Sequence, residues 1–522
     1  MLRTAVGTYR QGPANVNASP LLLVLLGTGA LTFAGPALAS DPGAPDPPTT
    51  DELAAKADLL QAQVEALQAQ LNELKAQMAR VTPSWKGAPQ VADADAGWSF
   101  KPRGYVQFET AYVENPDDAI ETRTLGFNAR ARRVRLGAEG TIPGGFGYKV
   151  EVDFANSAVS FADAILTYAQ ENSPFSAIIG NHQTWQGLEQ VSSSRFLSFL
   201  ERAQMNDAFT HARRLGISLG AHDKANVLRL NAGIFTAHSI DASFDNDGWI
   251  AAGRATFSPH ALGGTLHLGA NYEHRRYQSN NSGPGQSPAI NAPSVNQSAR
   301  FRARPFLQTT DVRFVDTTTF AAKSDDIIGA ELGGVFGPFH AVGEAQWIRV
   351  KAYRAGDTLA GLDFPPPVNA SLVPSGDPSF FSWYAEAGYF LTGETRGYRN
   401  GLWDRTKVLH PLSKGGSGAV QLNARYDYLD LNSRAIQQGF RNDFSNGNSF
   451  VSNDLSRGGI QTGYLASLIW IPEDYVRFLV QLARTKVQGG PFAATVRPAS
   501  TEPLDQRSYG VNSVAMRAQV DF

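Results

Sequence analysis

Three arginines at alternate positions are the residues in this sequence whose type and spacing most directly indicate chemistry. Arg300, Arg302 and Arg304 are separated by single residues and followed by Pro305. In an extended chain this spacing places the three guanidinium groups on one side, about 6.6 Å apart, and a proline favours extended geometry at the residue before it. Because the guanidinium fork matches phosphate oxygens, such a row can pass an anion from site to site. The alternative interpretation is a basic loop that faces solvent or lipid headgroups.

Two further arginine clusters favour the same chemistry. The first comprises Arg132, Arg133 and Arg135. In a strand, Glu139 would lie on the same face as Arg133 and Arg135. At a constriction with low-dielectric walls, such groups would raise the local anion concentration. They could equally be inner-wall charges paired with Glu and Asp, as a large polar lumen requires. The second cluster begins at Gly187-Leu188-Glu189 and continues with Ser192, Ser193, Ser194, Arg195, Glu201, Arg202, Arg213 and Arg214.

The elements that must position these residues have the pattern of β-strands. From Gly97 onward, segments of about ten residues alternate apolar with polar or small residues, as the strands of a transmembrane barrel do. In residues 148–154 the apolar members would face one side, and Lys149, Glu151 and Asp153 the other. Because charge is costly against lipid but not beside water, the alternation predicts lipid outside and water inside.

The strands of a soluble β-sandwich also alternate apolar and polar residues, so the positions of the aromatic residues must distinguish it from a membrane barrel. Aromatic side chains at strand ends are typical of the two interfacial girdles of a membrane barrel. They are Tyr112, Tyr168, Trp249, Phe257, Trp347 and Tyr389. The chain also ends in an alternating segment with a terminal Phe522, which resembles the carboxy-terminal assembly signature of outer-membrane barrels.

The length of this region predicts the number of strands. About 425 residues follow Gly97, and at ~10 residues per strand they fit a barrel of roughly 16 strands. Segments 278–298, 354–382 and 432–457 are rich in Asn, Ser, Gly and Pro and suit extracellular loops or a loop folded into the lumen, whereas 142–145 suits a short periplasmic turn. The predicted fold class is all-β: an antiparallel transmembrane β-barrel, residues 98–522.

Four N-terminal segments precede the predicted barrel. Residues 1–39 predict a secretory signal peptide, with an apolar run after Arg10 and an A-x-A cleavage site; the alternative, a membrane anchor, has fewer than the ~20 residues that span a bilayer. Residues 40–50 and 83–97 predict linkers, and residues 51–82 a coiled-coil helix. Its seam predicts self-association as a trimer, with docking on the chain's own barrel as the alternative. The seam consists of Leu53, Ala57, Leu60, Val64, Leu67, Leu71, Leu74, Met78 and Val81.

Composition excludes several classes of function. A formal net charge of -2 argues against a nucleic-acid binder with a basic surface. The absence of cysteine rules out disulfide frameworks, thiol nucleophiles and Cys-ligated zinc. The nine histidines lack metal-ligand spacing and no G-x-S-x-G motif occurs, so we expect neither cofactor, metal nor enzyme activity. The alternative is a hydrolase with a His/Ser pair on a barrel wall.

At these residues the chain resembles the phosphate-selective porin O/P family over roughly residues 98–522. The matching stretches are Arg132-Arg133 with Leu136-Gly137, Lys149 to Phe154, Gly187 to Arg202, Leu391 to Arg396, Arg425 to Asp427, and Phe522. The resemblance implies a 16-stranded trimeric porin whose constriction is lined by Arg from the second strand and the inward loop, with an Asp nearby. Arg132, Arg133 and Asp153 would then belong to the constriction, and Arg300, Arg302 and Arg304 to an arginine row leading in from outside. Tyr105 stands where the most phosphate-specific members carry an arginine.

These observations predict a bacterial outer-membrane porin, a homotrimer that admits small anions passively, phosphate or pyrophosphate first. Arg135, Arg195 and Arg202 join the anion-binding candidates. A general or organic-anion porin for carboxylates or sugar phosphates is one alternative. An envelope-tethering or adhesion protein, with the barrel as its anchor, is an alternative from a different class.

Overall fold

The computed structural model describes residues 49–80, 84–85, 87–93, 95–116, 125–155, 159–170, 172–237, 240, 248–277, 297–358, 368, 370–436 and 457–522. The predicted signal peptide, nearly all of the linker 40–50 and the predicted seam residue Val81 lie outside them, as do 278–296 and 437–456 of the predicted loops. The chain divides into two units, Met1–Glu73 and Leu74–Phe522.

Helix α1 (Thr50–Arg80) spans nearly all of the described chain before residue 81. This confirms the predicted helix. The seam side chains Leu60, Val64, Leu67 and Leu71 are exposed to solvent along it, so its coiled-coil association stays a prediction. Within the described chain, no helix has the length and apolarity needed to cross a membrane.

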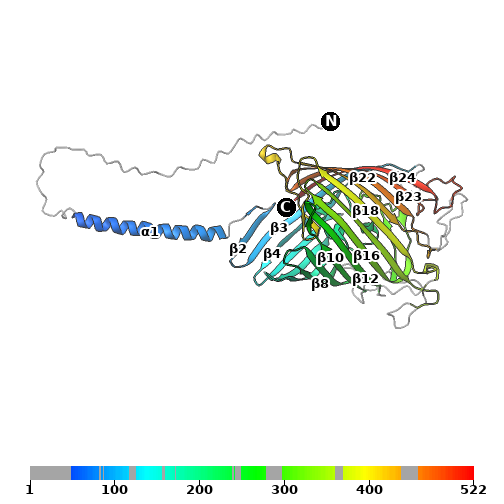
Figure 1. Ribbon diagram of the computed structural model, residues 1–522, viewed down its shortest axis with the longest axis horizontal. Coiled ribbons are helices and arrows are strands. Elements are labelled where there is room, and N and C mark those ends of the chain that lie inside the picture. Colours follow the sequence, from blue (N-terminus) through cyan, green and yellow to red (C-terminus); the bar gives the residue numbers. More distant parts are fainter. Residues whose placement is uncertain are drawn as a thin grey trace, which may run out of the picture. The chain divides into compact units, whose positions relative to one another are not determined.

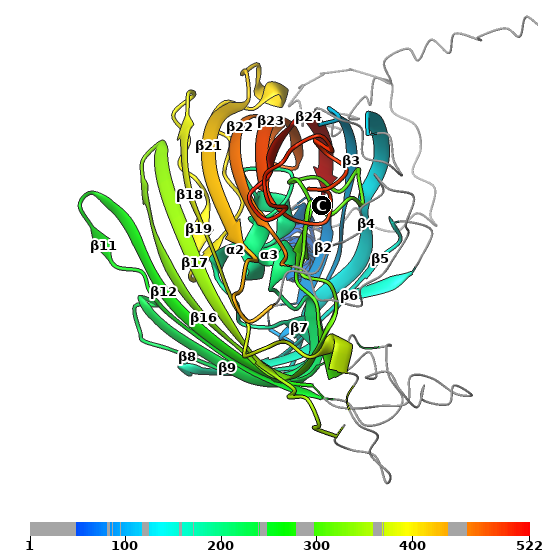
Figure 2. The same cartoon turned by 90° about the vertical axis from the view of Figure 1, so that its right-hand side faces the viewer.

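Among the described residues, sixteen antiparallel strands pair in chain order and close into a ring, because the last strand pairs with the first. Closure leaves no edge strand, so every spanning segment finds its backbone partners without water. Figure 1 shows the tilted strands from the side, and Figure 2 shows the ring with α2 and α3 inside it. The predicted 16-stranded antiparallel barrel is confirmed.

The ring strands are β3 (Trp98–Val113), β4 (Phe127–Ile142), β5 (Phe146–Asp153), β6 (Ser160–Ala169), β7 (Phe175–Gln183), β8 (Arg213–His222), β9 (Leu228–Thr236), β10 (Trp249–Phe257), β12 (Gly264–Arg276), β16 (Phe320–Phe336), β17 (Phe339–Ala352), β18 (Ser379–Phe390), β21 (Ala419–Asp430), β22 (Ile460–Glu473), β23 (Val476–Gln488) and β24 (Ser508–Asp521). The minor strands are β1 (Ser84–Trp85), β2 (Pro89–Asp93), β11 (His260–Ala261), β13 (Ser298–Ala299), β14 (Arg302–Ala303), β15 (Val315–Asp316), β19 (Tyr398–Arg399) and β20 (Leu402–Trp403). The short helices are α2 (Leu188–Val191), η2 (Ser194–Phe196), α3 (Gln204–Ala208), η4 (Ala370–Leu372) and η5 (Leu412–Lys414).

Side chains alternate across the wall as predicted. In β23, Leu482 is exposed on the outside, whereas the neighbouring Gln481 and Ala483 are buried toward the inside. All six aromatic residues predicted for the girdles are exposed on the outer surface. The wall therefore presents apolar and aromatic groups to lipid and polar groups to the lumen.

The connections between strands differ at the two ends of the ring. One end, here the turn end, has short turns such as 143–145, 337–338 and 474–475; the other, the loop end, has long connections such as 184–212 and 277–319. In outer-membrane barrels the short turns are periplasmic and the long loops extracellular. The connection 391–418 is an exception that the sequence analysis did not predict, because it is long but joins β18 to β21 at the turn end.

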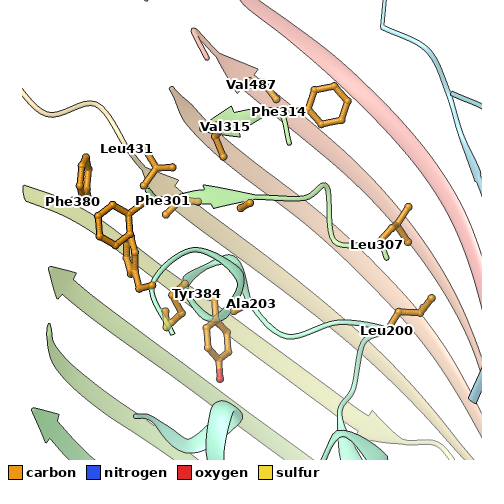
Figure 3. Close-up of a cluster of buried hydrophobic side chains, with 14 of the residues drawn as sticks. Leu200, Ala203, Phe301, Leu307, Phe314, Val315, Phe380, Tyr384, Leu431 and Val487 are labelled. Carbon is orange, nitrogen blue, oxygen red and sulfur yellow. The ribbon is translucent and has the colours of Figure 1, made fainter. Parts of the chain in front are cut away.

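The apolar core lies inside the ring rather than between two sheets. Segments 184–212 and 297–319 pack apolar side chains against inward-facing residues of β18, β21 and β23. Figure 3 shows Leu200 and Phe301 on these segments, with Phe380, Leu431 and Val487 on or beside the strands. Because these segments fill one side of the lumen, the space for water lies along the other side.

An arginine placed halfway up the lipid-facing wall should destabilise the barrel. Ala330 faces outward and pairs in register with Ala270 and Ala345 of the adjacent strands. We expect Ala330→Arg to lower the free energy of unfolding by about 2–4 kcal/mol, and Ser379→Arg, at the loop end of β18, by about 0–1 kcal/mol. Urea unfolding from lipid vesicles measures both. Equal effects at the two positions would contradict the assignment of the lipid-facing surface.

Candidate functional site

A β-bulge on β4 aims two consecutive arginines into the lumen. Gln107 pairs with Arg133 and Phe108 with Ala131, so Arg132 is the extra residue of the register shift. A bulge re-aims a side chain that strict alternation would turn outward. Arg132 and Arg133 consequently both face the interior, which alternation alone did not predict.

The arginines of β4 are compensated to different extents. Arg132 donates to both oxygens of Glu201, at 2.6 and 3.0 Å. Arg135 donates to Asp153 at 2.7 Å. Arg133 donates to the Gln107 amide oxygen at 2.8 Å, and its distance to Glu201 is 3.7 Å. Arg133 therefore has the weakest carboxylate contact of the three.

The inward loop, residues 184–212, is held by carboxylates of the far wall. Glu344 on β17 accepts the backbone N–H groups of Leu188 and Glu189 at 2.7 and 2.8 Å. Farther along the loop, Asp427 on β21 accepts the Gln204 N–H at 3.2 Å. These three hydrogen bonds, made at two separate points of the loop, hold it across the lumen.

Gly187 allows the loop to approach this wall closely. Its φ is +71°, and a Cβ atom built there would lie 2.4 Å from Glu344 Oε2. Any other residue would push the carboxylate away from the two N–H groups that it accepts. Glycine at this position thus sets the depth at which the inward loop sits.

Two cavities lie between the inward loop and strands β3 to β8. One cavity includes Arg304 of the loop end and is here called the upper cavity. It has a volume of about 180 Å³ and is also lined by Arg132, Glu201 and Asp207 among others. The lower cavity, about 220 Å³, is lined by cations, by two carboxylates and by Ser192, Ser193 and Ser194. Arg133 and Arg202 line both. The cations of the lower cavity are Arg103, Arg133, Arg135, Lys149, Arg195, Arg202 and Arg213.

Arg202 lies where the two cavities meet, and no carboxylate of the described residues is within ion-pair distance of it. Its Nε and Nη2 atoms donate to the carbonyl oxygens of Glu189 and Ser192, both at 2.8 Å. Burial lowers the pKa of Arg202 to about 10, which still leaves it charged at neutral pH. For Glu201, burial acts to raise the pKa, but Arg132 and Arg133 outweigh it and hold the pKa well below its usual range.

The structure places the predicted arginine row at the loop end. Arg300, Arg302 and Arg304 alternate with the buried residues Phe301 and Ala303 and are more exposed than these. Arg300 pairs with both oxygens of Asp316, and Arg304 donates to Asp207 at 3.4 Å. The backbone of Arg302 pairs with that of Asp316, but its side chain has no ion-pair or hydrogen-bond partner within the described chain. Arg304 is the member that reaches the upper cavity.

Two cations of the lower cavity, Arg103 and Lys149, belonged to neither predicted arginine cluster, whereas Arg213 belonged to the second. Arg103 pairs with Glu151 at 3.1 Å and with Glu139, and Lys149 and Arg213 both pair with Asp163. Arg103 lies two residues before Tyr105, on the same inward face of β3. The sequence could have identified Arg103 by its position on the first strand, because it lies two residues from Tyr105 and therefore on the same, inward-facing side.

Of the predicted site residues, the structure brings Arg132, Arg133, Arg135, Arg195, Arg202 and Arg304 to the two cavities, with Asp153 bound to Arg135. Arg300 and Arg302 do not line either of them. Arg195 also lines a third cavity of about 30 Å³ with Arg396, Arg405 and Arg477 of the turn end. The guanidinium groups of Arg135 and Arg195 lie 5.5 and 5.7 Å from the centre of the Tyr105 ring.

A His/Ser pair does occur on the wall, between His182 Nε2 and Ser218 Oγ at 2.7 Å. Ser218 also accepts the indole N–H of Trp185 at 3.0 Å and is only 1% exposed. A substrate therefore has no access to its hydroxyl group, and the pair acts as a structural contact. Among the described residues, no group of three or more His, Asp or Glu has the geometry to hold a metal ion.

Comparison with known proteins places this geometry in a family. The family model described as "Phosphate-selective porin O and P" matches residues 100–522. An uncharacterised protein of Caulobacter vibrioides is 32% identical over 449 residues, which cover 84% of this chain and 77% of that protein. Porin O of Pseudomonas aeruginosa is 26% identical, over 66% of this chain and 76% of that one.

Among solved structures, an anion-selective porin from Comamonas acidovorans is similar in fold, with a TM-score of 0.43 and 12% identity. The alignment covers 81% of this chain and 100% of that one.

A side chain at Gly187 should release the inward loop. We expect Gly187→Ala to increase the single-channel conductance about twofold and to weaken ion selectivity, because binding in the lumen depends on the loop position. Gly263→Ala is the matched control, since Gly263 also has a positive φ, +77°, but no atom within 4 Å of the added Cβ. Both variants bear the ~1–3 kcal/mol cost of the strained backbone. Unchanged conductance in Gly187→Ala would contradict the proposal that the close approach at Gly187 sets the position of the inward loop.

Proposed function

Because the chain belongs to the phosphate-selective porin O and P family, we propose that its outer-membrane barrel conducts small oxyanions, inorganic phosphate first, through the two cavities that share Arg133 and Arg202. The family and the closed 16-stranded ring make the chain a porin of the bacterial outer membrane. Anion preference, and phosphate among anions, is the finer proposal argued below.

The observation that carries the proposal is the charge balance of the lower cavity. Seven cationic side chains line it together with two carboxylates, Glu151 and Asp163, among the described residues. Three further carboxylates, those of Glu139, Asp153 and Glu201, pair with these cations without lining the cavity, so positive charge still exceeds negative charge. A narrow space with low-dielectric walls concentrates counter-ions of opposite sign. A small anion therefore gains in this cavity, whereas a small cation is repelled.

The opposite wall has more acidic than basic side chains, but several of these carboxyl groups accept hydrogen bonds from the inward loop. Strands β12 to β21 carry more buried carboxylates than arginines, and those on β17, β18 and β21 accept hydrogen bonds from the loop. These groups are thus withdrawn from the water-filled side. The buried carboxylates are Glu273, Asp325, Glu331, Glu344, Glu386 and Asp427.

The pairing pattern also favours release. A fully compensated arginine such as Arg132 offers little to an anion, and an isolated one would hold it too tightly for transport. Arg133 and Arg202 are intermediate, because amide and carbonyl oxygens occupy some of their donors. An oxyanion can exchange contacts between these two residues and the hydroxyl groups of Ser193 and Ser194 without complete dehydration.

Removing the two shared arginines should weaken phosphate binding strongly. We expect the double variant Arg133→Gln, Arg202→Gln to raise the phosphate concentration that half-blocks chloride current by about 10–100-fold. This corresponds to the net loss of about one charged hydrogen bond of roughly 1.5–3 kcal/mol, because glutamine still donates neutral hydrogen bonds. The reversal potential in a salt gradient should shift toward zero. Planar-bilayer recordings measure both.

The matched control is Arg399→Gln, in the connection 391–418, where Arg399 is 74% exposed and pairs with Asp404. It should change neither quantity. Competition by succinate separates phosphate from the organic-anion alternative: a wild-type channel blocked equally by both would reject phosphate preference. Cation preference in the wild type would reject the proposal as a whole.

The tethering alternative predicts that helix α1 is the active part of the chain. We expect a variant that lacks residues 53–78 to keep its conductance and anion preference, because neither cavity includes these residues. Bilayer conductance of the shortened protein is the measurement. Loss of conductance from a correctly folded, detergent-stable barrel would place the function in the helix.

A further inference from the structure

Exposed cations on the outside of the barrel are confined to one end. Among the described ring strands, the exposed Lys and Arg side chains lie within the last five residues before the loop end. The turn end of the same strands has none among the described residues. These side chains are Arg276 on β12, Arg349 and Lys351 on β17, and Arg484 and Lys486 on β23.

Three of the five form a compact patch across β12, β16 and β17. Ser324 pairs in register with Arg276 on one side and with Lys351 on the other. Adjacent strands are about 4.8 Å apart, so the backbones of the two cations are about 10 Å apart with a hydroxyl group between them. One row nearer the turn end, Asp326 lies between His274 and Arg349. We call Arg276, Ser324, Arg349 and Lys351 the loop-end patch.

The donors of this patch are largely free. Arg276 and Arg349 have no hydrogen-bond or ion-pair partner within the part of the chain that the structure describes. Lys351 shares Asp377 with Arg354, at 3.2 and 2.9 Å. Asp326 accepts hydrogen bonds from Tyr272 and is within 2.8 Å of His274 Nδ1. The patch therefore has more uncompensated positive than negative charge.

The neighbouring row fixes the depth of the patch in the membrane. Tyr272, Ile328 and Trp347 pair in register directly below it, and the Trp347 ring lies 4.9 Å from that of Phe381. Tyrosine and tryptophan mark the boundary between hydrocarbon and headgroups. The cations thus lie at headgroup height, and below the aromatic row the surface continues with the alanines Ala270, Ala330 and Ala345.

We propose that the loop-end patch binds the phosphate groups of an outer-leaflet lipid. A guanidinium, an ammonium and a hydroxyl group in one row offer the charge-assisted donors that phosphate oxygens accept. Charge complementarity selects this occupant, because a second copy of the chain would bring its own patch of the same sign. The site lies outside the lumen and is independent of the anion pathway.

Native mass spectrometry of the detergent-purified protein, incubated with purified lipid A that carries both phosphates, tests the proposal. We expect the double variant Arg276→Gln, Lys351→Gln to bind about tenfold less lipid A than the wild type, the loss of roughly one charged contact. Lipid A without phosphates should bind weakly to both proteins. The reversal potential should be unchanged, which shows that the barrel is intact.

The matched control is Arg484→Gln, Lys486→Gln, which removes the same charge from the same end. On β23, Arg484 donates to Asn512 at 2.8 Å and Lys486 lies over the Tyr464 ring, so each of the two cations already has a partner on a neighbouring strand. It should bind lipid A within about twofold of the wild type. An equal loss in both variants would overturn a built site in favour of general surface charge. If the variant Arg276→Gln, Lys351→Gln alone dissociated into subunits in the absence of lipid, the patch would be a contact between subunits and the lipid proposal would be overturned.

Discussion

The position of the inward loop depends on one interaction, the Glu344 carboxylate that accepts the N–H groups of Leu188 and Glu189. A carboxylate inside a barrel must be compensated or it destabilises the fold. The loop supplies the compensation, and Gly187 permits the approach that makes it possible. Once residues 187–189 are fixed at this wall, the later residues of the same loop lie at the opposite wall. Glu201 then meets Arg132, and Arg202 enters the boundary between the two cavities. The distribution of free positive charge follows from that placement.

Pairing decides which arginines remain available to a mobile ion. The strand β4 presents four guanidinium groups to the lumen. Those of Arg132 and Arg135 each contact a carboxylate at hydrogen-bond distance. Arg133 is left with a neutral amide and a carboxylate at 3.7 Å. The number of arginines therefore overstates the strength of the site. In the proposed function, the field of the whole lower cavity, rather than one fork of donors, attracts the anion, while the partial occupation of each donor keeps the binding reversible.

The sequence predicted the barrel well because alternation is a local property that repeats in every strand. It also drew attention to the arginine clusters, since Arg132 and Arg133 are consecutive and Arg202 follows an acidic residue; their role in anion binding stays a prediction. It could not predict the bulge that turns Arg132 inward, because a register shift depends on the partner strand. The Glu201 contact joins residues 69 positions apart, and no pattern of spacing encodes such a pairing. The long connection 391–418 was missed for a related reason: its contacts with the inward loop, not its composition, hold it in place.

Tyr105 stands where the family resemblance implies an arginine, and its contacts show how the proposed anion pathway could keep its positive charge without one. Its ring lies beneath the guanidinium groups of Arg135 and Arg195, and an aromatic face attracts a cation. The tyrosine thus orders two neighbouring arginines instead of adding a third charge. Arg103, two residues earlier on the same face, brings a guanidinium into the same cavity from a lower position. In the proposed channel, anion preference is therefore a property of the summed charge of the cavity, whereas discrimination among anions depends on the few donors that pairing leaves free.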